Sequence, residues 1–256
     1  MTPTGSSPTP PHSPARASAA TRSLPGLHEQ VLDALGGDIC AGRLTPGSVL
    51  TLQRIEERFG VSRSVGRETI RVLDSMRLVV SRRRVGVVVL PPDEWNLFDP
   101  RVVHWRLQAP DRDAQIAALA ELRIAVEPEA ARLAATRATS AEVAELVSIA
   151  GRMWAAGEDE DRERFHELDL GFHSLVLVAS RNGMFSRLES VISDTLTGRR
   201  EHGLGPDQPL PVSLGLHAEV SAAIQRRDPT VSFSSMRRLL LQSVAESMPH
   251  RGDRRS

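Results

Sequence analysis

Lysine and tyrosine are both absent from this chain of 256 residues, and cysteine occurs only once, as Cys40. A single cysteine excludes a disulfide within the chain and fits a reducing cytoplasm. No apolar run approaches the roughly 20 residues of a membrane-spanning helix. The first residues also lack the charged start and apolar core of a secretory signal. We therefore expect a cytoplasmic protein that has no membrane partner.

The net charge is zero, but the charges are unevenly distributed. Residues 1–106 hold fourteen arginines and ten acidic residues, whereas residues 107–250 hold fifteen arginines and twenty-one acidic residues. The first part thus carries a net charge of +4 and the second −6, so a polyanion would bind the first part. The length and the 40% of hydrophobic residues allow two domains, each with its own core.

Residues 52–79 predict two short helices joined by a tight turn. Thr51 is placed to cap the first helix and Gly60 to end it in a left-handed conformation. Ser62 or Ser64 is placed to cap the second helix. Helical spacing gives each helix one apolar face, formed by Leu52, Ile55 and Phe59 and by Val65, Ile70 and Leu73. Such a pair, with a second helix that begins with hydrogen-bond donors, suits the major groove of DNA.

A hairpin is predicted directly after these helices. Two β-branched runs in residues 79–89 flank three arginines and Gly86. Residues 54–84 hold nine arginines against four acidic residues, a net charge of +5. An ordinary helix pair with a solvated basic face would explain the charge alone. It would not explain the hairpin, which indicates a wing that reaches phosphates or the minor groove.

The predicted fold class is mainly α, with a winged helix-turn-helix domain followed by an all-helical bundle of about six helices. Pro91 and Pro92 end the hairpin and open a linker, in which Trp95, Leu97 and Phe98 are expected to dock between the domains. Beyond it only helical patterns occur. The predicted order is a disordered tail at 1–24, the DNA-binding domain at 25–91, the linker at 92–106, the bundle at 107–249 and a basic tail at 250–256.

The stretch GVSRSVGRETIRVLDSMRLV, followed by RRRVGVVVL, resembles the winged helix of the GntR family of bacterial repressors. The helical part resembles the FCD effector domain of the FadR subfamily. The resemblance implies a transcription regulator, a repressor, that forms a homodimer on a short inverted repeat of double-stranded operator DNA. It also implies a small-molecule effector in the helical domain. Linkers similar to the one at residues 95–100 occur in relatives that respond to sugar acids, which implies a sugar acid or another carboxylate.

DNA contacts are expected at the second helix and the wing. Two features depart from the family pattern: Gln53 stands where an arginine is frequent, and Gly66 replaces a bulkier residue. A glycine inside a helix costs up to about 1 kcal/mol. Arginines are expected on guanines or phosphates, serines on phosphates, and a glycine at the wing tip. The candidate residues are Arg54, Ser62, Arg63, Ser64, Arg67 and Gly86.

A candidate metal site follows from LDLGFHSLVLVASRN. Asp169 and His173 lie four residues apart and therefore on one helix face, although a helical histidine is more often a polar neighbour than a ligand. The resemblance to the FCD metal motif adds His217 and implies a divalent ion such as Zn, Ni or Mn. Leu239 stands where the family has a further histidine, so water would complete the shell and the affinity should fall. His166 lies two turns from His173, about 10 Å, which is too far for the same ion.

Two further residues match effector-binding positions of the family. Arg123 matches an arginine that points into the cavity, where it would bind a carboxylate bidentately, but a salt bridge to Glu127 is an equal alternative. Asn182 matches an asparagine of the family, or it simply ends its helix. The rival function is a metal-dependent enzyme that uses the same aspartate and two histidines, but no general-base motif accompanies them. A third possibility, an RNA-binding interaction module, is disfavoured by the helix-turn-helix.

Overall fold

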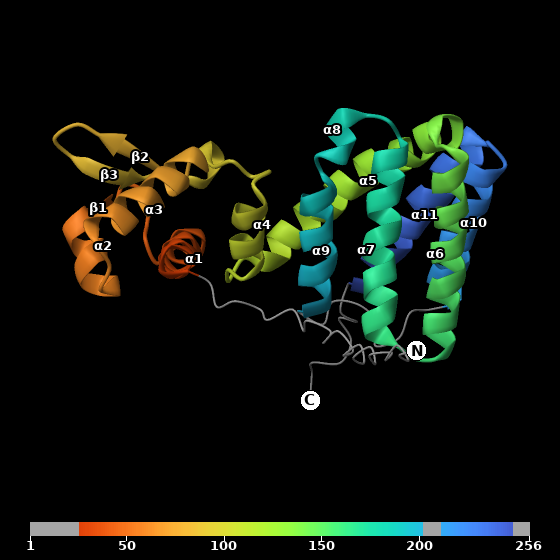
Figure 1. Cartoon of the computed structure of the whole chain (residues 1–256), viewed down its shortest axis with the longest axis horizontal. Coiled ribbons are helices and arrows are strands. Elements are labelled where there is room, and N and C mark those ends of the chain that lie inside the picture. Colours follow the sequence, from red (N-terminus) through yellow and green to blue (C-terminus); the bar gives the residue numbers. More distant parts are fainter. Residues whose placement is uncertain (1–25, 202–210, 248–256) are drawn as a thin grey trace, which may run out of the picture.

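The computed structural model describes residues 26–201 and 211–247. The two predicted tails and nearly all of the Gly- and Pro-rich loop between residues 203 and 211 lie outside the described residues. Helices and a small sheet at one end of the molecule are followed by a helical bundle at the other end, with α4 between them (Figure 1).

The N-terminal part contains the predicted helix pair, and the predicted caps are confirmed. The hydroxyl of Thr51 accepts from Arg54 N at 3.3 Å, and the hydroxyl of Ser62 accepts from Val65 N at 3.4 Å. Gly60 ends the first helix of the pair with φ at 63°. The elements are α1 Leu27–Cys40, β1 Val49–Leu50, α2 Leu52–Phe59, α3 Arg63–Ser75, β2 Val79–Arg82 and β3 Gly86–Val89.

The wing is an antiparallel hairpin of β2 and β3, as predicted, and β1 adds a third strand in the order β1-β3-β2. The sequence analysis missed β1, because two residues are too few for an alternating pattern. Gly86 lies where β1 and β3 meet, with φ at 117°. A Cβ there would lie 3.0 Å from a methyl group of Val49, so the position requires glycine for close strand packing.

Gly66 has a comparable role between α2 and α3. It is buried, and a Cβ added to it would lie 3.3 Å from Leu52 Cδ2 and 3.7 Å from Ile55 Cγ2. The missing side chain lets the two helices approach closely. This close approach accounts for a glycine inside α3, despite its cost in helix propensity.

The predicted linker contains a 3-10 helix, η1 Pro92–Glu94, and the helix α4 Pro100–Leu107. Trp95 is buried in the N-terminal core and donates a hydrogen bond from Nε1 to the Leu90 carbonyl oxygen at 2.9 Å. Leu97 and Phe98 are 40% and 59% exposed. The expectation of docking was therefore wrong for these two residues, whose side chains remain exposed in the single chain.

The helix α4 packs between the two parts through two glycines. A Cβ on Gly36 of α1 would lie 2.3 Å from the Trp105 ring, and a Cβ on Gly198 of the helix α9 (Glu189–Glu201) would lie 2.8 Å from Leu107 Cδ1. Trp105 also donates from Nε1 to Asp33 Oδ1 at 3.3 Å. The two ends of the molecule are thus connected by a helix that is in close contact with both.

The C-terminal part is a helical bundle with six long helices and the single turn α8 among the residues described, which confirms the predicted architecture. Thr139 and Glu142, whose spacing in the sequence is that of a capping box, form one at the start of α6, and Asp228 caps α11. None of the described helices is long and apolar enough to cross a membrane. The elements are α5 Arg112–Arg137, α6 Ser140–Glu158, α7 Arg162–Ala179, α8 Gly183–Ser186, α9 Glu189–Glu201, α10 Pro211–Gln225 and α11 Pro229–Ser247.

The bundle core is mainly apolar, but it also encloses several buried polar side chains. Phe172, Val176 and Leu177 of α7 are completely buried in this core. Arg123 and Glu127 of α5 are buried in the same bundle, 3% and 0% exposed. Buried charged groups are costly unless they are paired, so this group indicates a built site.

Candidate functional site

The exposed face of α3 presents the predicted DNA contacts to solvent. Arg63, Ser64 and Arg67 are exposed there, and Ser62 is the exposed N-cap. Arg54 is exposed in the first turn of α2. Gly86 is half-buried near the tip of the wing, where it pairs with Arg82 directly before the turn, and the exposed Arg83 and Arg84 lie in that turn.

Two other arginines of the N-terminal part are held by a buried carboxylate. Arg43 Nε and Arg58 NH2 lie 2.5 and 2.6 Å from the two carboxylate oxygens of Asp38. Burial alone would raise the pKa of Asp38, but the hydrogen bonds from the two arginines outweigh it and keep the pKa below its usual value. The Arg58 contact joins α2 to α1, although the side chains of Arg43 and Arg58 remain 62% and 51% exposed.

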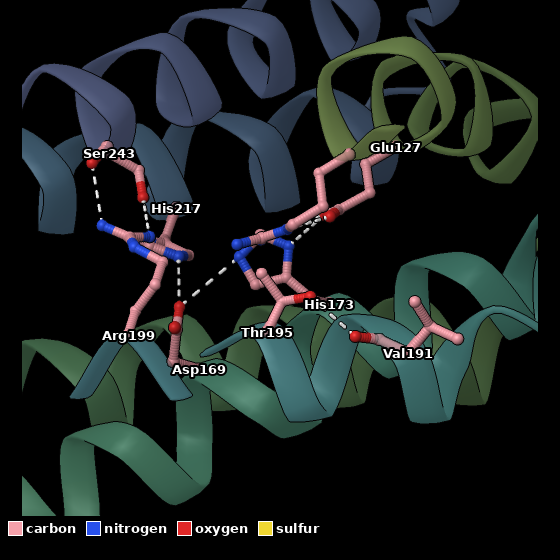
Figure 2. Close-up of polar contacts among 9 residues, drawn as sticks. Glu127, Asp169, His173, Val191, Thr195, Arg199, His217 and Ser243 are labelled. Atoms are coloured by element: carbon pink, nitrogen blue, oxygen red, sulfur yellow. Dashed lines mark hydrogen bonds and ion pairs between the residues drawn. The ribbon is translucent and has the colours of Figure 1, made fainter. Parts of the chain in front are cut away.

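The second site lies in the bundle and brings together the three predicted metal ligands (Figure 2). Asp169 and His173 come from α7 and His217 from α10. Asp169 Oδ1 lies 3.0 Å from His217 Nε2 and 3.4 Å from His173 Nε2. One ligand atom from each of the three residues lies within 4.8 Å of the others.

Glu127 extends this cluster, and the sequence analysis missed it as a site residue. Its Oε2 contacts His173 Nδ1, and its Oε1 accepts from Arg123 Nε at 2.5 Å. The structure therefore shows the salt bridge that was one of the two alternatives for Arg123. Burial would raise the pKa of Glu127, but Arg123 and His173 hold it at about 2. The spacing of Arg123 and Glu127 indicated their pairing, whereas nothing in the sequence indicated the contact with His173.

The hydrogen bonds of the two rings determine where their protons lie. His217 Nδ1 is 2.8 Å from the carbonyl oxygen of Ser213, which can only accept, so this nitrogen carries a hydrogen. His173 Nδ1 faces the ionised Glu127 and does the same. In a neutral ring Nε2 then has a free lone pair, and both Nε2 atoms face Asp169.

Asp169 Oδ1 and the Nε2 atoms of His173 and His217 all direct lone pairs at the same point, and this arrangement needs a positive charge between them. A ring proton can supply it: burial lowers the pKa of His173, but Glu127 outweighs burial and raises it. With ring protons on Nε2, hydrogen bonds from His173 and His217 outweigh the effect of burial and hold the pKa of Asp169 well below its usual value. A divalent ion supplies the same charge, and two imidazoles with one carboxylate are a donor set that suits such ions. The residues therefore fit the implied metal.

Arg199 of α9 is a further site residue that the sequence did not indicate. It donates from NH2 to the Ser243 carbonyl oxygen at 2.8 Å and from NH1 to the Ser243 hydroxyl (Figure 2). Burial, followed by the charge of Arg123, lowers the pKa of Arg199 to about 10, and Asp169 is close enough to act against this. An arginine thus lies next to the two-histidine, one-carboxylate cluster.

The remaining predicted positions lie around this cluster. His166 is separate from it, as expected, with Nε2 3.4 Å from Thr197 Oγ1. Asn182 caps α8, where its Oδ1 accepts from Met184 N at 3.0 Å. Leu239 is 2% exposed in α11, one turn before Ser243.

Comparisons with known proteins agree with this arrangement. Residues 27–89 match the family model for bacterial regulatory proteins of the gntR family, and residues 118–242 match the FCD domain. The galactonate operon transcriptional repressor of Escherichia coli (strain K12) is 34% identical over 221 residues, which are 82% of this chain and 96% of that protein. LutR, an HTH-type transcriptional regulator of Bacillus subtilis (strain 168), is 28% identical over 60% of this chain and 68% of its own length.

Among solved structures, that of Lar from Listeria monocytogenes covers 88% of this chain and 98% of its own, with a TM-score of 0.57 at 15% identity, which supports the fold. A DNA-binding head joined to a ligand-binding helical domain defines a transcription regulator. The chain belongs to the GntR family, and its FCD domain is consistent with the FadR-like branch. These matches identify a regulator and give no support to the metal-dependent enzyme.

Proposed function

We propose that this chain is a homodimeric repressor that acts in the cytoplasm and binds an inverted-repeat operator. A carboxylate effector, such as a sugar acid, binds in the bundle and causes the repressor to release the DNA. The convergence of Asp169, His173 and His217 beside Arg199 carries the proposal. A carboxylate needs cationic partners in a buried site, and this cluster provides an arginine and a place for a divalent ion. The name of the Escherichia coli relative refers to galactonate, a sugar acid, and supports this class of effector.

The proposed ion is held by Asp169 Oδ1, His173 Nε2 and His217 Nε2. When bound, it supplies positive charge that attracts an effector oxygen. Arg199 is assigned to the effector carboxylate, because it lies close to Asp169, one of the three proposed metal ligands. Arg123 already pairs with Glu127, so we expect it to act through that contact. The effector role of Asn182 stays a prediction, since its side chain caps α8.

The net charge of the buried site should make the binding of metal and effector cooperative. Without the ion, Asp169 is offset by Arg199, and Glu127 by Arg123, if both rings are neutral. A divalent ion adds two positive charges to this buried group, and an anionic effector offsets part of that excess. The ion should therefore increase the affinity for the effector and, by linkage, the effector should tighten the ion by the same factor.

Operator binding tests this proposal. In gel shifts with the DNA upstream of the chain's own gene, sugar acids such as galactonate together with Zn²⁺ should weaken binding at least about tenfold, ~1.4 kcal/mol. Asp169→Asn should bind the same DNA but no longer respond, because one ligand of the ion is lost. Asp159→Asn, an exposed aspartate at the end of α6, is the matched control and should respond like the parent. A normal response by Asp169→Asn would rule out the assigned site.

The dimer has a separate test. Leu97 and Phe98 are exposed apolar side chains in a single chain, and we assign them to the contact between two copies. Light scattering should give twice the 28.0 kDa of one chain, and Leu97→Ser with Phe98→Ser should shift the population towards monomer. Met184→Ser, which changes an apolar residue that is 76% exposed elsewhere, should have no such effect. Only monomer, with and without DNA, would contradict the proposal.

A further inference from the structure

We propose that Glu127 is a positioning residue of the buried site: it fixes the proton of His173 on Nδ1 and so keeps Nε2 available as a metal ligand. Arg123 holds the Glu127 carboxylate in place for this task. The inference rests on the proposed ion site, because the ring that Glu127 orients belongs to one of the three implied ligands.

The contacts of Glu127 fix its orientation from two sides. Its side chain is 0% exposed, and each carboxylate oxygen has its own partner. Oε1 accepts from Arg123 Nε at 2.5 Å, and Oε2 contacts Nδ1 of His173, 46 positions away on α7. Because both oxygens are engaged, Glu127 does not take the place of the missing fourth ligand. It acts on the ion through His173.

Two acceptors compete for the one proton of a neutral His173 ring. Glu127 faces Nδ1, whereas Asp169 Oδ1 lies 3.4 Å from Nε2. If the proton lay on Nε2 and were donated to Asp169 Oδ1, the Nε2 lone pair that a metal needs would be lost. The Glu127 contact is the shorter of the two and is buried, and it therefore favours the tautomer with hydrogen on Nδ1. A carboxylate on the far nitrogen also makes the ligating nitrogen more basic.

His217 reaches the same tautomer by a different route. Its Nδ1 donates to a backbone carbonyl oxygen, that of Ser213, at 2.8 Å. No side-chain substitution removes that acceptor. The two histidines of the cluster thus differ in a way that an experiment can use, since a change at Glu127 should alter His173 and leave His217 as it is.

The test compares the full-length parent with a double variant, Arg123→Met with Glu127→Met. Glu127→Gln alone would leave the Arg123 charge buried without its partner. Replacing both members of the pair leaves no such charge, so the double variant should fold. The matched control is Glu129→Met with Arg132→Met, which removes a partly exposed pair on the same helix. Circular dichroism confirms that each protein is folded.

The first measurement needs no metal. In chelator-treated protein labelled with ¹⁵N-histidine and kept in alkaline buffer, the parent and control should show His173 with hydrogen on Nδ1. The double variant should show hydrogen on Nε2 of His173 and an unchanged His217. A His173 tautomer that is the same in all three proteins would overturn the inference, whether or not the parent binds metal.

The second measurement is the affinity for Zn²⁺. If the parent binds it, the double variant should bind 10- to 100-fold more weakly, the usual loss when a group behind a metal ligand is removed. Equal affinity in parent and double variant would also overturn the inference. A parent that binds no Zn²⁺ would contradict the proposed ion site instead, and the tautomer measurement would still decide the role of Glu127.

Discussion

Replacing Arg63 or Arg67 by alanine should weaken operator binding by about 1–3 kcal/mol, roughly 5- to 150-fold, for each arginine that contacts a base. Both side chains are exposed on α3, whose N-terminus is capped by Ser62 and is open to solvent. A helix that enters the major groove uses its N-terminal residues on base edges, and arginine pairs bidentately with guanine. The loss should be largest for the operator and small for unrelated DNA.

The control variant for this prediction also loses one arginine, but in the bundle and not in α3. Arg152→Ala removes one exposed arginine from α6 of the bundle, where it pairs with Glu145, and operator affinity should not change. The salt dependence separates two kinds of contact, because loss of a phosphate contact reduces the slope by about one and weakens all sequences alike. Unchanged affinity in both the Arg63 and Arg67 variants would show that α3 does not read the operator.

Local features of the fold could be predicted because neighbouring residues determine them. The caps at Thr51, Ser62 and Thr139 depend on groups within three positions, and the structure has each of them. The strand β1 was missed because its two residues join the sheet through β3, almost forty positions away in sequence. The exposure of Phe98 could not be predicted either. The sequence pattern of an apolar residue does not distinguish a side chain buried within its own chain from one available for contact with a second chain.

The buried site shows the same limit. The spacing of Asp169 and His173 placed both on one face of α7, but His217 came only from the resemblance to FCD domains. Glu127 and Arg199 were missed as site residues, because their contacts join α5 to α7 and α9 to α11 across 46 and 44 positions. No pattern within a single helix contains such information. The contacts of Nδ1 in the two rings, with Glu127 and with the Ser213 carbonyl oxygen, fix where the ring protons lie and so decide whether the ligating Nε2 atoms are free.

Introducing an imidazole at Leu239 should tighten the proposed metal site at least about tenfold, ~1.4 kcal/mol. Leu239 is 2% exposed and lies four residues before Ser243, whose hydroxyl and carbonyl groups contact Arg199 beside the cluster. Residues four apart share a helix face, so Leu239 lies on the strip of α11 that faces the site. Leu239→His would add a third imidazole to a centre that otherwise needs water or effector oxygen, and the site of the parent should lose its ion readily to a chelator.

Metal titration of the parent, Leu239→His and Leu240→His decides this prediction. Leu240 is a neighbouring buried leucine, 3% exposed, about 100° away around the helix, so a histidine there should destabilise the fold and bring no gain in affinity. No gain in Leu239→His would show that its side chain does not reach the ion. Tight stoichiometric metal in the parent would instead require a fourth ligand from the chain itself. If neither the parent nor Leu239→His binds metal, the pocket has lost its ion, and Leu239 packs against an apolar part of the effector while the two histidines donate hydrogen bonds.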